Sequence, residues 1–492
     1  MVKRSNASDA VKAFPFGSAI QLARAIRGGT ISSVELLRAY LDRVDRLNPA
    51  LNAVIIDDRE QAVKHARSAD RALARGLKVG PLHGVPITVK ESFNIDGQQT
   101  TWGYPALRGN IATEDAVAVS RLRAAGAVVF AKTNVPIALG DFQSYNEVYG
   151  TTNNPWDITR GPGGSSGGSA AAMAAGLSGL EFGSDIGGSI RNPASYCGVY
   201  GHKPTFAIVP KRGQTTNQQL LVEGDISVVG PIARSAQDLA LALKVTSGPD
   251  ELVSAGWKLQ LPPPCKSVKG LRVGVWLDQP NLSPVDNVVS AQIELAATAL
   301  RKAGAKVDFA ARPGFDVVQA HETYQRLLMG LMSVGRPDFD QLAAKAAALD
   351  VDDRRPYAEQ LRWSTATFNA FAEAENQREH LRWAWHDFFG NYDVLLAPIT
   401  PTPAFPHDHS EPAAARTLTV NGEEVPYYAQ LFWAGLATAA YLPATVAPAG
   451  QTSDGLPVGL QIIGASMTDR TTIWLAGELG KLIGGFTPPP GY

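Results

Sequence analysis

The chain has 492 residues, a formal net charge of −1 and only two cysteines. This charge gives no electrostatic reason to expect binding of nucleic acid or of an anionic membrane surface. Two cysteines allow neither a disulfide framework nor a paired zinc site. The N-terminus lacks the apolar stretch of a signal peptide, and no apolar run is long enough for a membrane helix. We therefore expect a cytoplasmic protein without a membrane anchor.

The first 80 residues are predicted to form a mainly helical N-terminal region. Apolar stripes in 17–46 indicate two helices, and Ser32 or Ser33 with Glu35 is a plausible start for the second. A short strand is expected at 53–56, followed by a helix at 59–76.

Residues 81–205 alternate between strand and helix patterns and are expected to form the catalytic core. Continuous apolar runs predict buried strands, whereas the small residues of 169–176 indicate a helix that packs closely on its neighbours. The predicted strands are 85–89, 127–131 and 180–183, and the predicted helices are 115–125 and 169–176.

The second half continues this alternation, after a proline-rich linker at 261–264. We expect 265–395 to be a helical insertion on the substrate side and 396–492 to return to the sheet. Alternating strands and helices favour an α/β fold with helices on both faces of the sheet. The predicted strands are 271–276, 306–309, 393–397 and 460–464. The predicted helices are 235–245, 287–304, much of 316–388, and 468–483, with a long loop at 402–424.

Two glycine-rich loops each present a serine. In the second loop, Gly187 and Gly188 directly precede Ser189. Glycines allow successive N–H groups to point into one concavity, which can bind a carbonyl oxygen as it becomes an oxyanion. One such donor stabilises a transition state by about 3 kcal/mol. An ordinary turn is the alternative interpretation.

Ser165 lies in the first loop, residues 163–169. A flexible linker fits badly, because an apolar helix follows, and the loop lacks the lysine of a phosphate-binding P-loop. The loop also matches the Gly-x-Ser-x-Gly nucleophile elbow. That motif requires a preceding apolar strand, and residues 159–162 cannot form one.

Lys90 ends the predicted strand at 85–89. Its structural alternative is an ion pair with Glu91. To act as a base near neutral pH, the lysine needs its pKa lowered by about 3 units, equivalent to about 4 kcal/mol. Burial could supply this shift. Lys90 would then take a proton from Ser165, and Ser165 would take one from Ser189.

These motifs together resemble the amidase signature family, and weaker similarity extends over nearly the whole chain. The matching stretches are Leu82-His83-Gly84-Val85-Pro86-Ile87-Thr88-Val89-Lys90-Glu91, Gly163-Gly164-Ser165-Ser166-Gly167-Gly168-Ser169, Gly183-Ser184-Asp185-Ile186-Gly187-Gly188-Ser189-Ile190-Arg191, Cys197-Gly198-Val199-Tyr200-Gly201 and Lys203-Pro204-Thr205.

The resemblance implies a single α/β domain over 1–492, with a mixed twisted sheet covered by helices. It implies that Ser189 is the nucleophile of an acyl-enzyme, that Ser165 bridges it to the base Lys90, and that a non-proline cis peptide bond adjoins Ser165. The oxyanion hole would comprise the N–H groups of Ile186, Gly187, Gly188 and Ser189. Ser166, Asp185 and Arg191 would organise the site around these groups.

The expected activity is hydrolysis of carboxamide C–N bonds in small amides with an apolar or aryl part, with esters and carbamates (urethanes) as further substrates. We expect a monomer or homodimer that uses no cofactor and no metal, because the histidines form no ligand cluster. His202 is either a core histidine or a modifier of the site. The predicted substrate-binding residues are Leu139, Gly140, Phe142, Gln143 and Ser144. Aromatic residues of 402–440, namely Tyr427, Tyr428, Phe432 and Trp433, could line the same pocket or belong to the core.

Two alternatives remain open. One is an amidotransferase component that delivers ammonia from glutamine to a mischarged tRNA and works with partner subunits. Against it, the sequence after Thr205 lacks the Tyr-Gly-Arg continuation common in such proteins. The other is a non-catalytic binding protein, which the presence of Lys90, Ser165 and Ser189 disfavours.

Overall fold

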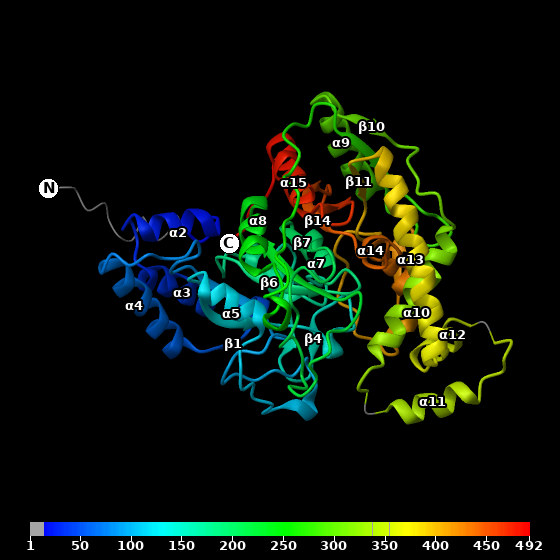
Figure 1. Ribbon diagram of the computed structural model, residues 1–492, viewed down its shortest axis with the longest axis horizontal. Coiled ribbons are helices and arrows are strands. Elements are labelled where there is room, and N and C mark those ends of the chain that lie inside the picture. The colour runs from blue at the N-terminus through cyan, green and yellow to red at the C-terminus, as the bar shows by residue number, and fades with distance from the viewer. Residues whose placement is uncertain (1–13, 337, 354) are drawn as a thin grey trace.

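The computed structural model describes residues 14–336, 338–353 and 355–492. An eight-stranded sheet crosses the molecule in the order β10-β9-β11-β15-β14-β7-β8-β6, and a three-stranded sheet has the order β1-β3-β2. Both sheets mix parallel and antiparallel pairs. Figure 1 shows the strands in the middle, the N-terminal helices on one side and α10–α13 on the other.

The N-terminal region is helical, as predicted. The hydroxyl of Ser32 accepts a hydrogen bond from the N–H of Glu35, and the Glu35 carboxylate accepts one from the N–H of Ser32. This capping box starts the second helix where the sequence predicts it. The elements are α2 (Ala19–Arg27), α3 (Ser33–Leu51), β1 (Val54–Asp57) and α4 (Arg59–Ala74).

The following segment provides most of the elements that carry the motifs. The predicted strands and helices are present, whereas α7, β4, β5, β7 and β8 were not predicted. The elements are β2 (Pro86–Lys90), α5 (Val117–Ala124), β3 (Val128–Thr133), β4 (Tyr145–Asn146), β5 (Gly150–Thr151), α6 (Gly167–Ala174), β6 (Glu181–Asp185), α7 (Arg191–Cys197), β7 (Tyr200–Lys203), β8 (Val228–Ala233) and α8 (Ala236–Thr246).

The remaining chain completes the large sheet and adds a group of helices. The span 265–395 is only partly helical, because it also supplies β9 and β10 to the sheet. The elements are β9 (Arg272–Val275), α9 (Asn287–Lys302), β10 (Lys306–Asp308), α10 (Val317–Met332), α11 (Phe339–Ala347), α12 (Pro356–Ser364), α13 (Phe368–Asn391), β11 (Val394–Ala397), β12 (Thr417–Val420), β13 (Glu423–Pro426), α14 (Leu431–Thr438), β14 (Ala444–Gln451), β15 (Pro457–Gly464) and α15 (Asp469–Ile483).

One prediction for this half needs correction. The expected loop at 402–424 contains strand β12 and the start of β13, which pair as an antiparallel hairpin. Beside the proline-rich linker at 261–264, Leu259, Leu261 and Cys265 pack against the main core. Short strands and proline-rich segments carry weak sequence signals, so tertiary packing decides their conformation.

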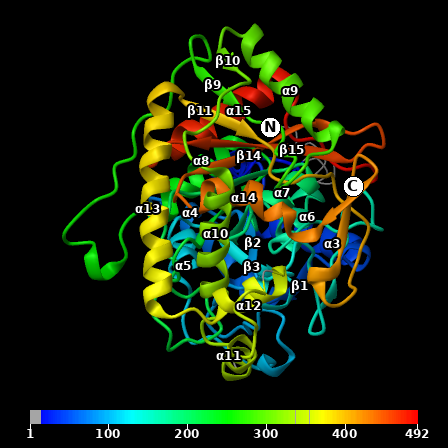
Figure 2. The same cartoon turned by 90° about the vertical axis from the view of Figure 1, so that its right-hand side faces the viewer.

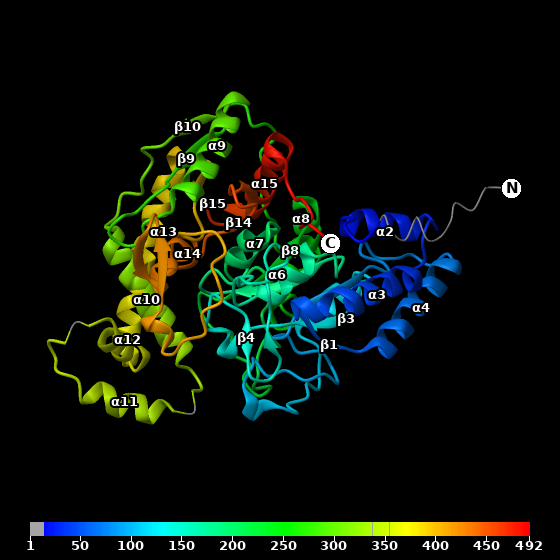
Figure 3. The ribbon, with the colours of Figure 1, turned by 180° about the vertical axis from the view of Figure 1, so that it is seen from behind.

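Helices cover both faces of the large sheet, as predicted. Helices α8, α9 and α15 pack together over one face, and α6 and α7 pack on the other. Figure 3 shows α2, α3 and α4 gathered on one side of the molecule and α10–α13 on the opposite side. In Figure 2, α13 runs along one edge with α10 and α12 beside it. No described helix has the length and apolarity required to cross a membrane.

The two sheets adjoin where β2 meets the chain that leads into β6. The N–H of Gly179 donates to Pro86 O at 3.0 Å, and the N–H of Thr88 donates to Leu180 O at 3.2 Å. These bonds show that the two segments run in the same direction. Lys90 and Asp185, which end β2 and β6, therefore lie at the same edge.

Candidate active site

The Ser165 loop is held by close backbone packing. The peptide bond between Gly164 and Ser165 is cis, as the family resemblance predicts. A Cβ on Gly164 would lie 2.2 Å from Asp141 O, so the backbone approach requires glycine at this position. The hydroxyl of Ser144 donates to Gly163 O at 3.0 Å and accepts from the N–H of Gly167 at 3.1 Å. Residues 141–144 thus pack against this loop and restrain its backbone.

Lys90 is completely buried at the end of β2. Its Nζ donates to the Ser165 hydroxyl at 2.6 Å and to the Ser184 hydroxyl at 2.9 Å. Burial lowers the pKa of Lys90 to about 7. Near neutral pH a substantial fraction of the lysine is therefore uncharged and able to accept a proton.

The alternative ion pair between Lys90 and Glu91 is not formed. The Glu91 carboxylate instead accepts hydrogen bonds from the N–H groups of Thr101 and Trp102 at 2.5 and 3.0 Å. Since successive side chains of a strand point to opposite faces, neighbours at a strand end readily turn away from each other. Burial thus outweighs the nearby acidic groups Asp185, Glu181 and Glu91, which act to raise the pKa of Lys90.

Asp185 and Arg191 organise the Ser189 loop from inside the protein. Their side chains pair at 2.9 Å, and both are fully buried. Burial on its own would raise the pKa of Asp185, but the Arg191 guanidinium outweighs it and the pKa falls to about 2. The Asp185 carboxylate also accepts hydrogen bonds from the N–H groups of Gly188 and Ile190 at 2.9 and 3.1 Å.

The bond from Gly188 corrects the predicted oxyanion hole. Because this N–H already donates to Asp185, it is not free to bind a substrate oxygen. The N–H groups of Ile186, Gly187 and Ser189 have no hydrogen-bond partner among the described residues. They remain as three candidate donors beside the hydroxyl of Ser189.

Ser189 lies beside the Ser165 loop and is slightly exposed, at 7%. The N–H of Ser166 donates to Ser189 O at 3.1 Å, which ties the two loops together. The Ser166 hydroxyl donates to Ser184 O at 3.4 Å. Within the described part of the chain, the Ser189 hydroxyl forms no hydrogen bond, so its predicted bond to Ser165 is not formed in this state.

The predicted substrate-binding residues divide into two groups. Leu139 is partly exposed and Gly140 is exposed, whereas Phe142 is buried with its ring 6.1 Å from that of Tyr427. The Gln143 amide donates to Asp408 O at 2.6 Å and accepts from the N–H of Asp408 at 2.9 Å. The side chains of Gln143 and Ser144 are thus occupied by structural contacts.

The aromatic residues of 402–440 have mainly structural roles. Phe432 and Trp433 pack against Trp276 in the main core. Tyr427 is buried, and its hydroxyl donates to Asp141 at 2.6 Å. Tyr428 lies partly buried at the edge of a smaller apolar cluster.

This smaller cluster adjoins the Ser189 loop, and the sequence did not reveal it. It includes Tyr324 of α10 and Leu431 of α14, and Ile186 packs against it. A Cβ on Gly187 would lie 3.3 Å from Leu431 Cδ2 and 3.5 Å from the Tyr324 hydroxyl. Neither residue belongs to a recognisable motif, since each is one apolar position among many in its helix.

His202 is a core histidine. It is fully buried in β7, where its Nδ1 lies 2.9 Å from Thr445 Oγ1 and its Nε2 lies 3.2 Å from Asp469 Oδ1. Burial lowers its pKa below the usual range. Among the described residues, no group of histidine, cysteine, aspartate and glutamate could hold a metal ion.

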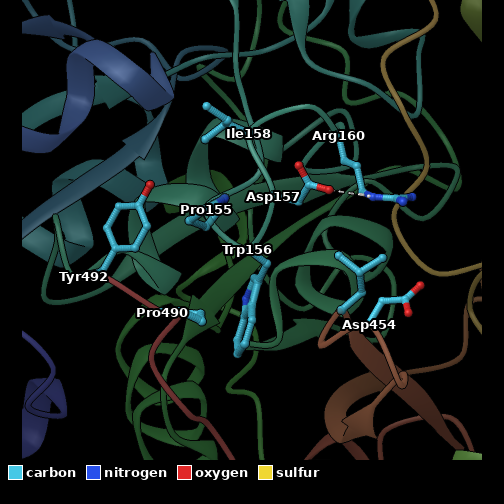
Figure 4. A pocket seen from close by; sticks show the side chains of 9 residues that line it. Pro155, Trp156, Asp157, Ile158, Arg160, Asp454, Pro490 and Tyr492 are labelled. Atoms are coloured by element: carbon cyan, nitrogen blue, oxygen red, sulfur yellow. Dashed lines mark hydrogen bonds and ion pairs between the residues drawn. The ribbon is translucent and has the colours of Figure 1, made fainter.

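A surface cavity of about 420 Å³ is lined by none of the predicted site residues (Figure 4). Asp157 and Arg160 at its rim pair at 3.0 Å, and Trp156 donates its indole N–H to Cys197 O. Its polar side chains are thus partly engaged within the protein. Its lining residues are Pro155, Trp156, Asp157, Ile158, Arg160, Asp454, Leu456, Pro490 and Tyr492.

The fold and the two serine loops are those of a class of amide hydrolases. The chain matches the amidase family over residues 35–473 and belongs to that family. It is 36% identical over 465 residues to indoleacetamide hydrolase of Bradyrhizobium diazoefficiens, covering 91% of this chain and 82% of that protein. It is 33% identical over 466 residues to acylamidase of Rhodococcus erythropolis, covering 93% of each.

Other relatives and solved structures extend this comparison. A glutamyl-tRNA(Gln) amidotransferase subunit of Chromobacterium violaceum is 33% identical, with 90% of this chain and 93% of that protein covered. The structure of 6-aminohexanoate cyclic dimer hydrolase complexed with substrate matches with a TM-score of 0.78 and 27% identity, covering 97% of this chain and 99% of that one. A bacterial aryl acylamidase of the amidase signature family has the same fold, with a TM-score of 0.80, 24% identity and coverage of 95% and 96%. The chain is accordingly an amide hydrolase.

Proposed function

We propose that the enzyme cleaves amides through an acyl-enzyme on Ser189, with Ser165 and Lys90 as a proton relay. One observation carries this proposal: a fully buried lysine amine lies 2.6 Å from the Ser165 hydroxyl and has its pKa lowered to about 7. A nucleophilic serine needs an adjacent base, and no histidine is required when an uncharged amine can take this role.

In the proposed reaction, neutral Lys90 takes the proton of Ser165, and Ser165 takes the proton of Ser189. The Ser189 oxygen attacks the amide carbon, and the carbonyl oxygen becomes an oxyanion. The proton returns through Ser165 to the leaving nitrogen as the C–N bond breaks. Water then attacks the ester and gives its proton to the same relay. The relay passes this proton to Ser189 Oγ as the ester C–O bond breaks and the acid leaves.

The N–H groups of Ile186, Gly187 and Ser189 are proposed to bind the oxyanion. Each unpartnered donor aimed at the developing charge contributes about 3 kcal/mol to transition-state stabilisation. The carboxylate of Asp185 holds the following turn through Gly188 and Ile190, and Arg191 in turn holds Asp185. In this proposal Asp185, Arg191 and Ser166 position the loops without contacting substrate.

We propose a substrate with an apolar or aryl acyl part. The support is the apolar cluster beside the Ser189 loop, with Leu431 and Phe142 as members and Met332 packed against it. Leu139 and Gly140 would lie at its entrance, since a Cβ on Gly140 would approach Met332 Cε at 3.8 Å. Relatives that act on indoleacetamide or are acylamidases agree with this class. Esters and carbamates with the same acyl part are further candidates.

The amidotransferase alternative is supported only by relatives of that name. Glutamine has a charged α-amino and α-carboxylate group, which the apolar cluster beside Ser189 would bind poorly. The isolated chain should therefore hydrolyse aryl amides faster than glutamine. Faster release of ammonia from glutamine would favour the alternative.

The mechanism is tested by three single substitutions assayed on an activated aryl amide. Ser189→Ala and Lys90→Ala should each lower kcat by at least about a thousandfold. His202→Ala should retain much of the activity, because this histidine lies in the core. Loss of activity in His202→Ala with retention in Lys90→Ala would instead indicate a histidine-based hydrolase. Mass spectrometry of the wild-type enzyme, quenched during turnover of an ester, should find the acyl group on Ser189.

A further inference from the structure

Tyr324 of α10 contacts the Ser189 loop from the apolar cluster. Its hydroxyl donates to Ile186 O at 2.9 Å, and its side chain is 1% exposed. The ring packs directly on Gly435 of α14, where a Cβ would lie 2.6 Å from Tyr324 Cδ1. Glycine at this position leaves just enough room for the ring. The hydroxyl is thus fixed by packing and not by the hydrogen bond alone.

The acceptor, Ile186 O, belongs to the same peptide unit as the N–H of Gly187. In a trans peptide the C=O and N–H bonds lie in one plane and point in opposite directions. A hydrogen bond that fixes the oxygen therefore also fixes the direction of the N–H. It also polarises the peptide, which strengthens the N–H as a donor by about 10–30%.

The Ile186–Gly187 peptide needs a hydrogen bond of this kind more than the neighbouring peptides do. Glycine at 187 tolerates many backbone conformations, so the peptide before it could rotate at little cost. Asp185 restrains the next turn through the N–H groups of Gly188 and Ile190. Among the described residues, Tyr324 provides the one side-chain hydrogen bond to the Ile186–Gly187 peptide.

We propose that Tyr324 is a positioning residue for amide hydrolysis. Its hydroxyl holds the Ile186–Gly187 peptide so that the Gly187 N–H faces the carbonyl oxygen of the substrate. The proposal rests on the proposed role of this loop as the oxyanion hole. It also assigns α10, which lies far from the signature motifs in the sequence, a direct part in the preorganisation of the site.

The test is Tyr324→Phe, which removes only the hydroxyl. We expect kcat to fall about tenfold, less than the roughly 10²–10³ caused by loss of a whole oxyanion donor, because the Gly187 N–H remains present but is no longer held. KM should stay within about twofold. The inhibition constant of a boronic acid with the same acyl part should rise by the same factor as kcat/KM falls, since this probe mimics the tetrahedral state.

Tyr40→Phe is the matched control. Tyr40 is also fully buried, and its hydroxyl also donates to a backbone oxygen, that of Pro15. This variant should keep the wild-type kcat and boronic acid affinity, even if its melting temperature falls as far as that of Tyr324→Phe. Tyr324→Met provides a second hydroxyl-free variant, with the same expected losses, should Tyr324→Phe not fold.

The proposal is overturned if a folded hydroxyl-free variant keeps kcat within about twofold, or if kcat falls while boronic acid affinity is unchanged. Failure of the proposed function would look different. In that case Ser189→Ala would remain active, whatever the behaviour of the Tyr324 variants. If Tyr324 only stabilised the fold, its variants would lose stability but keep kcat and the affinity for the boronic acid.

Discussion

The guanidinium of Arg191 and the carboxylate of Asp185 meet 2.9 Å apart with both side chains fully buried. Arg191 also donates to Thr438 Oγ1, Gln461 Oε1 and Ala434 O. It therefore connects the Ser189 loop to α14 and β15. A buried charge with all its partners satisfied is costly to disturb, since removal of one member leaves the other uncompensated.

We expect Arg191→Ala to lower the free energy of unfolding by about 3–5 kcal/mol. Urea denaturation followed by circular dichroism measures this change. Arg336→Ala serves as the control, because its partner Asp338 and Arg336 itself are more than a third exposed. That surface pair should contribute about 1 kcal/mol or less. Equal losses in the two variants would refute a special role for the buried pair.

The activity should rise with pH through the neutral range. Because burial lowers the pKa of Lys90 to about 7, the amine is protonated and inactive below this pH and becomes a base above it. The profile of kcat/KM should increase about tenfold per pH unit on the acid side and level off above about pH 7. A flat profile between about pH 6 and 9 would contradict the assignment of Lys90 as the base.

Glu181 should make the stability of the protein depend on pH. It is buried at the start of β6, where it accepts hydrogen bonds from Thr88 and Thr133, and burial raises its pKa to about 8, above its unfolded value of about 4.3. A raised pKa means that the folded state binds the proton more tightly. The stabilisation is therefore fully present below about pH 4.3 and is lost as the pH rises through about 8.

The isosteric Glu181→Gln cannot ionise, so its stability relative to the wild type should increase between about pH 5 and pH 8. The change should be a few kcal/mol, given about 1.4 kcal/mol per pKa unit. Guanidinium denaturation at the two pH values gives the measurement. Glu424→Gln, at an exposed position of the β12–β13 hairpin, should show no such change. A difference in unfolding free energy between Glu181→Gln and the wild type that does not change with pH would refute the raised pKa of Glu181.

Gly164→Ala should disable the enzyme. The added Cβ would lie 2.2 Å from Asp141 O and 2.6 Å from Gln143 O, so the Ser165 loop would have to move. We expect kcat to fall at least about a hundredfold, because small displacements of a catalytic group are costly. A rate assay on the folded variant tests this, and activity near that of the wild type would contradict it.

Gly390→Ala is the control for this substitution. A Cβ at Gly390 meets no atom within 4 Å, and the residue lies within α13. Alanine there should leave kcat unchanged and stabilise the helix by up to about 1 kcal/mol. Loss of activity in this variant would indicate that the assay reports a general effect of glycine replacement.

The sequence predicted the parts of the site that depend on local motifs. Lys90 and Ser165 stand in characteristic strings, and the lowered pKa of the lysine follows from its place in an apolar strand. The sequence could not predict that Gly188 would donate to Asp185, because that bond depends on the exact turn. Nor could it show that Gln143 is occupied by Asp408, which is far away in the chain. Tyr324 was not predicted either, because its contact with Ile186 joins residues that are far apart in the chain.

The fold was likewise predictable where the hydrophobic periodicity of the sequence is strong, and it could not be predicted where this periodicity is weak. The buried strand β3 and the capped helix α3 are long and regular, and both were predicted. Strand β7 has four residues, and α7 has seven, including Pro193. Such short elements form because neighbours already placed in the sheet pair with them, so their conformation is decided by the whole domain.

The meeting of β2 with the chain entering β6 has a consequence for how activity is acquired. Lys90 arrives on one sheet and Ser184 on the other, yet they share a hydrogen bond of 2.9 Å. Neither sheet alone can assemble the base with its hydroxyl partners. During refolding, activity should thus return only after β2 has come into contact with the chain entering β6. Fragments cut between the two strands should be inactive until they reassociate.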